Sequence, residues 1–136
     1  MNKSLNLYKN EFSIWHINGY NFPIKIESEY ECFFIRNMIC WGWATWKNRW
    51  MEFMNDSNSI NPNWLIENVS NHIREEMDLS IKPSINWSQV KLNAKGAINT
   101  WAIFWYCYIY RRNGLCLTPC HSLVKNIGHD GSGENC

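Results

Sequence analysis

The chain has 136 residues, a length that suits one domain or part of a larger one. Hydrophobic residues make up 46% and aromatic residues 15%, which is enough to build a packed core and excludes a disordered chain. The formal net charge of +1 excludes the strongly basic surface by which proteins bind nucleic acids or anionic membranes.

The start of the chain, MNKSLNLYKNEF, contains no apolar run of the kind found in a secretory signal. The most apolar stretch, residues 101–110, is far shorter than the roughly 20 residues that a bilayer span needs. We therefore expect a cytoplasmic protein with no transmembrane segment. Peripheral attachment at the inner membrane stays open.

The first half of the chain predicts two strands between helical segments. Residues 5–10 have the composition of a helix end, and apolar and polar residues alternate over 12–20, which is typical of a strand. Residues 30–38 predict a second short strand. Residues 44–54 predict a helix, because tryptophan, phenylalanine and methionine recur at helical spacing, and Thr45 is available as its N-cap.

The second half predicts more helix. Residues 64–77 predict one polar helix, and Pro83 marks a break after it. Residues 101–112 predict a helix that Asn99 or Thr100 caps. This last helix is apolar nearly all round, so we expect it to be buried.

The C-terminal part predicts two short strands, at 115–119 and 122–128, and then a glycine-rich turn. The order of elements indicates one α/β or α+β domain over residues 1–136. The predicted buried helix and the two early strands carry more apolar surface than the chain can cover. This excess indicates a missing partner layer.

The stretch ICWGWATWKNRW holds four of the tryptophans. Trp46 and Trp50 lie four residues apart on the predicted helix, so both are core candidates. Trp41 and Trp43 flank Gly42 in a predicted turn, from which both rings can project. Flat indole rings beside small residues form a platform for the apolar face of a sugar ring, with N–H groups for its hydroxyls.

The tail NIGHDGSG is a second candidate site, because its glycines let the backbone approach a ligand closely. Backbone N–H groups there are able to hold a phosphate, and Asp130 adds an acid–base group. An ordinary turn is the alternative. The spacing of Cys116, Cys120 and His121, with His129 and Cys136 further on, permits a zinc site, with buried thiols as the alternative.

Four blocks then appear in a distinctive order. They are WHINGYNFP at 15–23, CWGWATWKNRW at 40–50, INTWAIFW at 98–105 and NGLCLTPCHSLVKNIGHDGSG at 113–133. Together they resemble the C-terminal half of a bacterial family 2-like glycosyltransferase of the GT-A type. The match covers nearly the whole chain and is weakest between residues 52 and 95.

The resemblance implies an α/β fold, a partial GT-A (Rossmann-like) domain of mixed short strands with packed helices. In such enzymes the N-terminal half binds the nucleotide-sugar and carries an Asp-x-Asp metal motif, and the C-terminal half shapes the acceptor site. This chain contains no Asp-x-Asp. By resemblance, the nucleotide-binding half is absent, and a separate nucleotide-binding polypeptide would be its partner.

The resemblance also assigns residues to a site. The loop that would face the donor sugar and the acceptor comprises Trp41, Gly42, Trp43, Ala44, Thr45 and Trp46. The closing loop beside the diphosphate would comprise Asn126, Gly128, Asp130, Gly131, Ser132 and Gly133. Asp130 is the candidate catalytic base, and no metal ligand is assigned.

Three features depart from the family pattern. Phe104 stands where the family tends to have arginine, Glu134 and Asn135 stand where it has Thr-His, and Asn18 replaces a serine. The intact family transfers a sugar from a nucleotide-sugar to a hydroxyl of a glycan or lipid-linked acceptor in surface polysaccharide synthesis, with Mg²⁺ or Mn²⁺. We expect low activity from this chain alone. The alternative is a non-catalytic carbohydrate-binding or partner-docking module.

Overall fold

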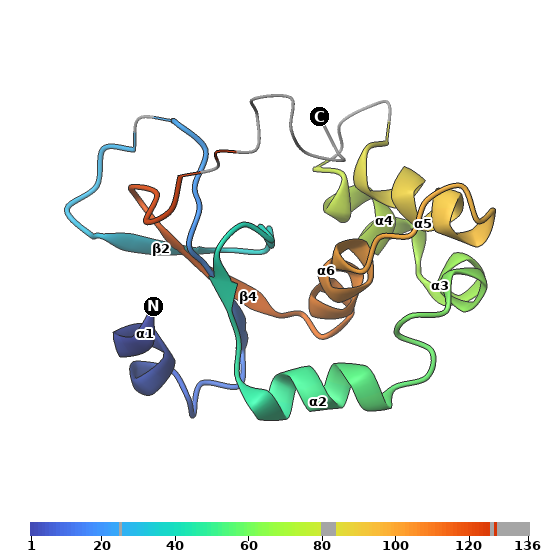
Figure 1. Ribbon diagram of the computed structural model, residues 1–136, viewed down its shortest axis with the longest axis horizontal. Coiled ribbons are helices and arrows are strands. Elements are labelled where there is room, and N and C mark those ends of the chain that lie inside the picture. Colours follow the sequence, from blue (N-terminus) through green and yellow to red (C-terminus); the bar gives the residue numbers. More distant parts are fainter. Residues whose placement is uncertain (25, 80–83, 126, 128–136) are drawn as a thin grey trace.

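The computed structural model describes residues 1–24, 26–79, 84–125 and 127, which form a mixed α/β structure (Figure 1). The helices are α1 (Asn2–Leu7), α2 (Lys47–Asn55), α3 (Pro62–Asn68), α4 (Asn71–Met77), α5 (Asn86–Ala94) and α6 (Ala102–Arg111). The strands are β1 (Ile14–Asn18), β2 (Cys32–Ile35), β3 (Trp43–Ala44) and β4 (Leu115–Pro119).

The strands form one mixed sheet in the order β2-β4-β1-β3. The central strands β1 and β4 run parallel, and β2 and β3 flank them antiparallel. Parallel neighbours need a long crossover, which here contains all the helices from α2 to α6. Figure 1 shows α3, α4, α5 and α6 gathered on one side of the sheet and α1 on the other.

A bulge in β1 joins the sheet to the helical layer. The register between β1 and β4 shifts between Ile14 and His16, so two successive side chains turn toward α6. The ring of Trp15 lies 6.2 Å from that of Trp105, and the Nδ1 atom of His16 lies 3.1 Å from the indole nitrogen of Trp105. Because both side chains face α6, the sheet and this helix share one core.

Helix α6 is the centre of that core. Every residue from Ile103 to Tyr110 is buried, as the apolar sequence predicts. Three rings from two other elements surround Trp105, those of Trp15 in β1 and of Trp50 and Phe53 in α2. Edge-to-face contacts between such rings add to the free energy gained by burial, each by about 1 kcal/mol.

The predicted helix over 64–77 is wrong as a single element. The chain forms α3 and α4 instead, with a break at Ser70. The Ser70 hydroxyl accepts a hydrogen bond from the Ile73 N–H at 3.4 Å and starts a new helix. Asn61 caps α3 in the same way through the Trp64 N–H.

Two predicted caps are also wrong. The Thr45 hydroxyl donates to the Trp15 carbonyl at 2.5 Å, and α2 begins after Trp46 without a side-chain cap. Helix α6 likewise begins after Trp101 without one, and the Thr100 N–H donates to the Asn93 side chain at 3.1 Å. The Thr100 hydroxyl accepts a hydrogen bond from the Asn93 side-chain amide at 3.0 Å. In both cases a contact with another element takes the hydroxyl that a local cap would use.

The end of the described chain holds a further correction. The strand expected over 122–128 does not form in its described residues, where the Ser122 hydroxyl donates to the Val124 carbonyl at 2.6 Å in a turn. The strands expected over 12–20, 30–38 and 115–119 are confirmed as β1, β2 and β4.

Helix α5 has no counterpart among the predicted elements. It begins where the Asp78 carboxylate accepts hydrogen bonds from the Asn86 N–H at 2.7 Å and the Trp87 N–H at 3.1 Å. The cap therefore comes from a residue eight positions before the helix. A cap so far away in sequence leaves no local pattern to find.

Candidate functional site

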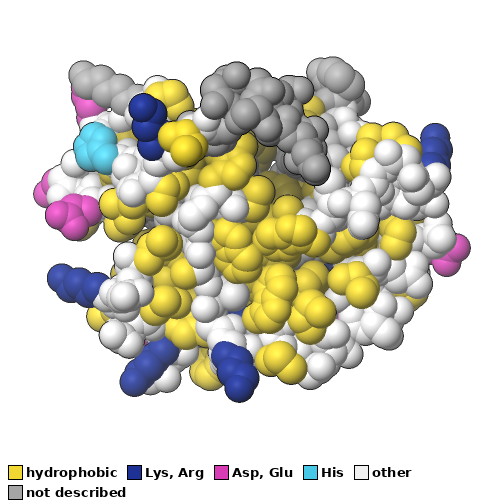
Figure 2. Space-filling model, in the orientation of Figure 1, with side chains coloured by type: hydrophobic (Ala, Val, Ile, Leu, Met, Phe, Trp, Pro, Cys, Tyr) yellow, Lys and Arg dark blue, Asp and Glu magenta, His cyan; other side chains and the backbone are white. Residues whose placement is uncertain are grey.

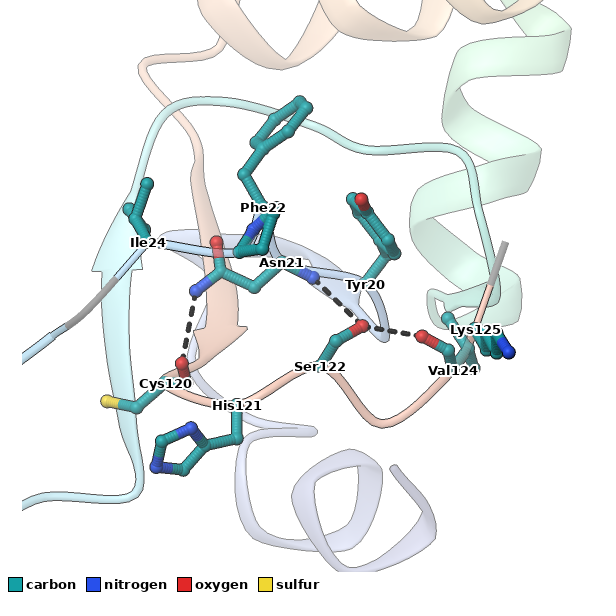
Figure 3. A pocket seen from close by; sticks show the side chains of 10 residues that line it. Tyr20, Asn21, Phe22, Ile24, Cys120, His121, Ser122, Val124 and Lys125 are labelled. Carbon is teal, nitrogen blue, oxygen red and sulfur yellow. Dashed lines mark hydrogen bonds between the residues drawn. The ribbon is translucent and has the colours of Figure 1, made fainter. Parts of the chain in front are cut away.

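Three pockets meet at the side chain of Phe22. The Trp41 pocket measures about 400 Å³ and the Arg36 pocket about 580 Å³, and both are also lined by Asn37 and Leu79. The His121 pocket, of about 390 Å³, is also lined by Phe22 (Figure 3). The first two together form a groove bounded by β2, the segment after it, and helices α4 and α6.

The groove has an apolar lining that is open to solvent. Phe22, Leu79 and Ile85 line the Trp41 pocket, and each is more than half exposed. Figure 2 shows hydrophobic side chains across the middle of one face of the molecule and charged side chains at its margins. Contiguous exposed apolar surface of this kind marks a binding site more often than a random surface does.

Polar groups interrupt the apolar lining of the Trp41 pocket. The amide side chains of Asn37, Asn86 and Gln89 line it together with Trp41, which is 37% exposed. The ring of Tyr20 stands edge-on to Trp41, with 4.9 Å between centroids. Aromatic faces with a few placed amides are the usual composition of a small-molecule pocket.

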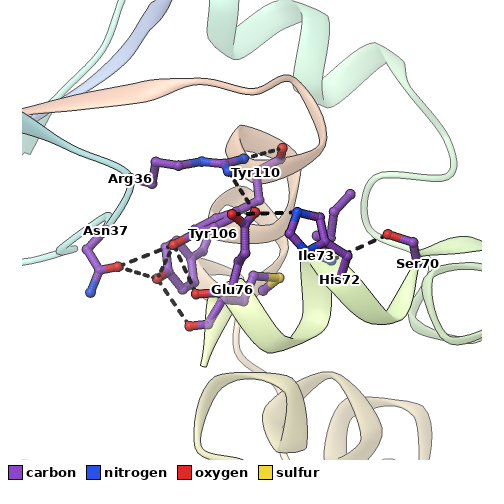
Figure 4. A network of polar contacts seen from close by, with 9 residues as sticks. Arg36, Asn37, Ser70, His72, Ile73, Glu76, Tyr106 and Tyr110 are labelled. Carbon is purple, nitrogen blue, oxygen red and sulfur yellow. Dashed lines mark hydrogen bonds and ion pairs between the residues drawn. The ribbon is translucent and has the colours of Figure 1, made fainter. Parts of the chain in front are cut away.

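The Arg36 pocket has a polar network at its floor (Figure 4). The Arg36 guanidinium lies 2.7 Å from a Glu76 oxygen, donates to the Tyr110 carbonyl at 3.0 Å, and sits 4.3 Å above the Tyr110 ring. The Tyr106 hydroxyl donates to the Asn37 side chain at 2.7 Å. Burial raises the pKa of Tyr106 and Tyr110, so both hydroxyls keep their protons as donors.

Both carboxylates that line the groove already have partners. Glu76 pairs with Arg36. Asp78 caps α5 and also accepts a bond from the Ser84 hydroxyl. A general base needs a free oxygen directed at its substrate, so these two carboxylates have structural roles in the described arrangement.

The His121 pocket is lined by polar side chains, among them those of His121, Ser122 and Lys125. Figure 3 shows the His121 ring and the Lys125 side chain at its opposite ends, with Ser122 between them. Asn21 connects the segment after β1 with the segment at 119–122. Its side-chain amide donates to the Pro119 carbonyl at 3.0 Å, and its N–H donates to the Ser122 hydroxyl at 3.3 Å.

The tryptophan-rich loop divides between a pocket and the core. Trp41 lines the Trp41 pocket, as the turn predicted. Trp43 does not project: its ring stacks on His16 at 5.1 Å and tilts against Trp50 and Trp101. The expectation that both rings project is therefore wrong for Trp43.

The remaining members of the predicted loop have structural contacts. Ala44 pairs with Ile17 in the sheet, and Thr45 bonds Trp15. The Trp46 indole donates to the Leu5 carbonyl at 2.8 Å, and the Arg49 guanidinium lies 3.9 Å above its ring. Trp50 packs against the core, as predicted.

Gly42 is required by its backbone and by its neighbours. Its φ is +57°, a region that favours glycine, and a Cβ there would lie 2.7 Å from Val124. A Cβ at Gly19 would lie 1.9 Å from the Gly42 carbonyl oxygen. The two glycines therefore allow β1, the tryptophan loop and the segment at Val124 to meet.

The predicted diphosphate-side loop is not among the described residues. Asn126, Gly128, Asp130, Gly131, Ser132 and Gly133 all lie outside them, as do His129, Glu134 and Asn135. The assignment of Asp130 as base stays a prediction. Phe104, in contrast, is described and is buried in the α6 core.

No group of three His, Cys, Asp or Glu side chains able to hold a metal occurs among the described residues. The Cys116 thiol lies 3.8 Å from the Arg36 carbonyl, and burial raises its pKa, which disfavours the thiolate that binds zinc. The Cys120 thiol lies 3.1 Å from the Tyr30 carbonyl. The buried Cys116 thiol is therefore unsuited to zinc, whereas His129 and Cys136, the other candidate ligands, lie outside the described residues. The divalent metal of the glycosyltransferase resemblance stays a prediction.

Most residues of the groove carry no signal in the sequence. The candidates did not include Phe22, Asn37, Asp78, Tyr106 or Tyr110. One signal was present: Tyr106 and Tyr110 lie four apart, on one face of a helix, with hydroxyls that need partners. The apolar character of the whole helix obscured it.

Known proteins give no further guide to this site. No family model, curated protein or solved structure matches the chain. Among the described helices, none is long and apolar enough to cross a bilayer.

Proposed function

We propose that this chain is the acceptor-side part of a glycosyltransferase and that it binds sugar rings in the Trp41 pocket. The observation that carries the proposal is the lining of that pocket, a partly exposed indole ring combined with the amides of Asn37, Asn86 and Gln89. A sugar ring can place its C–H face on the indole and its hydroxyls on the amides. The ordered resemblance of the four sequence blocks supports the same family.

In the proposed reaction an acceptor hydroxyl attacks the anomeric carbon of the donor sugar. The bond to the nucleoside diphosphate breaks, and a carboxylate base takes the hydroxyl proton. The nucleotide-sugar and the Mg²⁺ or Mn²⁺ of the intact family would be held by a separate nucleotide-binding half. The described residues would contribute acceptor binding, and Asp130 stays the proposed base.

A second candidate is a carbohydrate-binding module without catalysis. The engagement of Glu76 by Arg36 and of Asp78 by the start of α5 favours it, because both groove carboxylates are already bonded within the chain. The two candidates share the sugar site and differ only in transfer. Adding a nucleotide-binding half to the chain and assaying transfer separates them, since transfer by the mixture supports only the first.

Sugar binding is tested first with a glycan panel and the Trp41→Ala variant. We expect the wild-type chain to bind members of the panel and Trp41→Ala to lose at least tenfold in affinity, because the stacking face is gone. Its stability should fall by only about 1 kcal/mol, since the ring is partly exposed. Phe12→Ala is the matched control, because Phe12 is a 73% exposed aromatic that lines none of the three pockets.

Two exposed cysteines give a second readout in the same samples. Cys40 lines the Trp41 pocket and Cys32 does not. A bound glycan should slow alkylation of Cys40 and leave Cys32 unchanged, as measured by mass spectrometry. A folded chain that binds no glycan, or Trp41→Ala binding as wild type does, contradicts the proposal.

The assignment of the donor site to another polypeptide has its own test. Isothermal titration with UDP- and GDP-sugars, with and without Mn²⁺, should show no metal-dependent binding to this chain alone. Metal-dependent micromolar binding would mean that the chain holds a nucleotide site.

A further inference from the structure

Asn18 makes an unusual set of hydrogen bonds for a side chain. It is fully buried on β1. Its amide nitrogen donates to the Asn37 carbonyl at 3.0 Å and to the Thr118 hydroxyl at 2.8 Å, and its oxygen accepts from the Ile39 N–H at 2.7 Å. The side chain thus bonds the carbonyl of one residue and the N–H of the residue two positions later.

That pattern is the one by which a residue in a parallel strand bonds its neighbour. Here a carboxamide takes the place of the backbone, and the segment after β2 is attached to β1 without being a strand. Ile39 is 8% exposed, so its N–H would be buried and unsatisfied without Asn18.

His16, two residues earlier on β1, holds the same segment. The Trp105 indole nitrogen is only a donor, so the Nδ1 atom of His16 must accept that bond and the Nε2 atom must carry the proton. Nε2–H then donates to the Ile39 carbonyl at 3.2 Å. Both backbone groups of Ile39 are therefore bonded by side chains of β1.

This attachment matters for the groove because of what the segment carries. Asn37 and Trp41, on either side of Ile39, line the Trp41 pocket, and Ile39 lines both pockets of the groove. If this irregular segment became ordered only on binding, the entropy cost of ordering it would lower the affinity of the groove for its ligand. Fixing it in advance avoids that cost.

We propose that Asn18 and His16 are positioning residues for the groove, which hold residues 37–41 so that Asn37 and Trp41 face the ligand. The role rests on the proposed function only for the identity of that ligand, a sugar. The attachment itself is measurable without any ligand.

Hydrogen exchange of the wild-type chain tests the attachment directly. The Ile39 amide should exchange slowly, with a protection close to that of amides in β1, although it lies outside every strand. NMR of a ¹⁵N-labelled sample measures this residue by residue. Exchange of Ile39 at the rate of an unprotected peptide overturns the proposal.

The Asn18→Ser variant then isolates the contribution of the carboxamide. A serine hydroxyl cannot bond Asn37 and Ile39 together, so at least one bond to the segment is lost. We expect Ile39 exchange to rise on the order of tenfold, as one or two lost hydrogen bonds predict. The Ile109 amide in α6 reports global opening, and an equal rise at Ile39 and Ile109 would mean that Asn18 supports only overall stability.

Thr118→Val is the matched control. Thr118 is fully buried and bonds Asn18, but it does not bond the segment. The variant should leave Ile39 protected. If it loosens Ile39 as much as Asn18→Ser does, the bonds from Asn18 to the segment are not what holds it, and the proposal is wrong.

Glycan affinity completes the test and separates the two proposals. Asn18→Ser should weaken glycan binding several-fold, and Thr118→Val should not. An unchanged affinity in Asn18→Ser despite a loosened Ile39 overturns the positioning role and leaves sugar binding intact. A protected Ile39 in a chain that binds no glycan overturns sugar binding and leaves the attachment intact.

Discussion

Trp105 and Trp41 are the same residue type in opposite environments. Trp105 is completely buried in the α6 core, surrounded by rings from β1 and α2, and its indole N–H bonds His16. Trp41 is 37% exposed and contacts Tyr20 at the edge of a pocket. The comparison teaches that tryptophan enrichment alone does not mark a site, because most of these rings build the core that holds the few exposed ones.

The difference continues in the polar groups of the two regions. In the core, the polar atoms of His16, Asn18 and Thr118 bond one another or the backbone. Around the groove, the amide residues Asn37, Asn86 and Gln89 are partly exposed beside Phe22 and Leu79. A region with fully satisfied polar groups is rigid, whereas one with accessible groups is available to a ligand.

The largest expected effect comes from removing the core ring. Trp105→Ala should destabilise the chain by about 3–5 kcal/mol, because a large buried side chain leaves a cavity that its neighbours cannot fill. Chemical denaturation measures the loss. Trp101→Ala, at a tryptophan that is 47% exposed, is the control and should cost far less. Equal losses would contradict the division into a core and an exposed rim.

The second-largest effect is expected from acid, which should weaken the contacts that His16 makes between the core and the segment that lines the groove. Burial lowers the pKa of His16 from its ordinary value to about 4. As the pH falls, His16 is therefore protonated in the unfolded chain before it is protonated in the folded chain, and the free energy of unfolding decreases. The contribution of neutral His16 to the free energy of unfolding is fully present above about pH 6.5 and is lost as the pH falls from there to about 4. It amounts to about 3 kcal/mol.

The measurement is the free energy of unfolding as a function of pH for wild type and His16→Gln. Other groups titrate in both proteins, so the difference between the two curves isolates His16. The wild-type curve should fall more steeply between pH 6.5 and 4. Parallel curves in that window would mean that His16 is not held neutral.

A smaller effect is expected at the groove wall. Asp78→Ala removes the acceptor for the Asn86 and Trp87 N–H groups at the start of α5, and loss of such a cap costs about 1–2 kcal/mol. Circular dichroism and denaturation measure the change. Ser70→Ala, at the cap of α4, is the control for an ordinary local cap. A larger loss at Ser70 than at Asp78 would contradict the importance of the distant cap.

Much of the fold could be predicted because its signals are local. Alternation over 12–20 and the apolar run over 101–112 gave β1 and α6, since a pleated strand and a buried helix each impose their period on the side chains. The break at Ser70 was missed, because two short helices in succession share one apolar period. Helix α5 was missed, because its cap lies at Asp78, eight residues before the helix starts.

The candidate site was predicted only in part. Trp41 was found from its place beside Gly42, whereas Trp43 had the same local signal but is partly buried and stacks on His16. What separates them is His16, a residue of another strand that offers Trp43 a stacking partner. Contacts between residues far apart in the chain leave no recognisable pattern in the sequence around either residue.

The sequence by itself determined the mixed α/β class, the buried helix and the presence of aromatic rings near a glycine turn, because periodicity and residue type act over a few positions. Only the tertiary structure decided which rings are exposed, which carboxylates are already paired, and that Asn18 and His16 hold the segment after β2. Those outcomes depend on how the crossover from β1 to β4 folds back on the sheet. That return brings together side chains as far apart in the chain as Asn18 and Thr118, or His16 and Trp105.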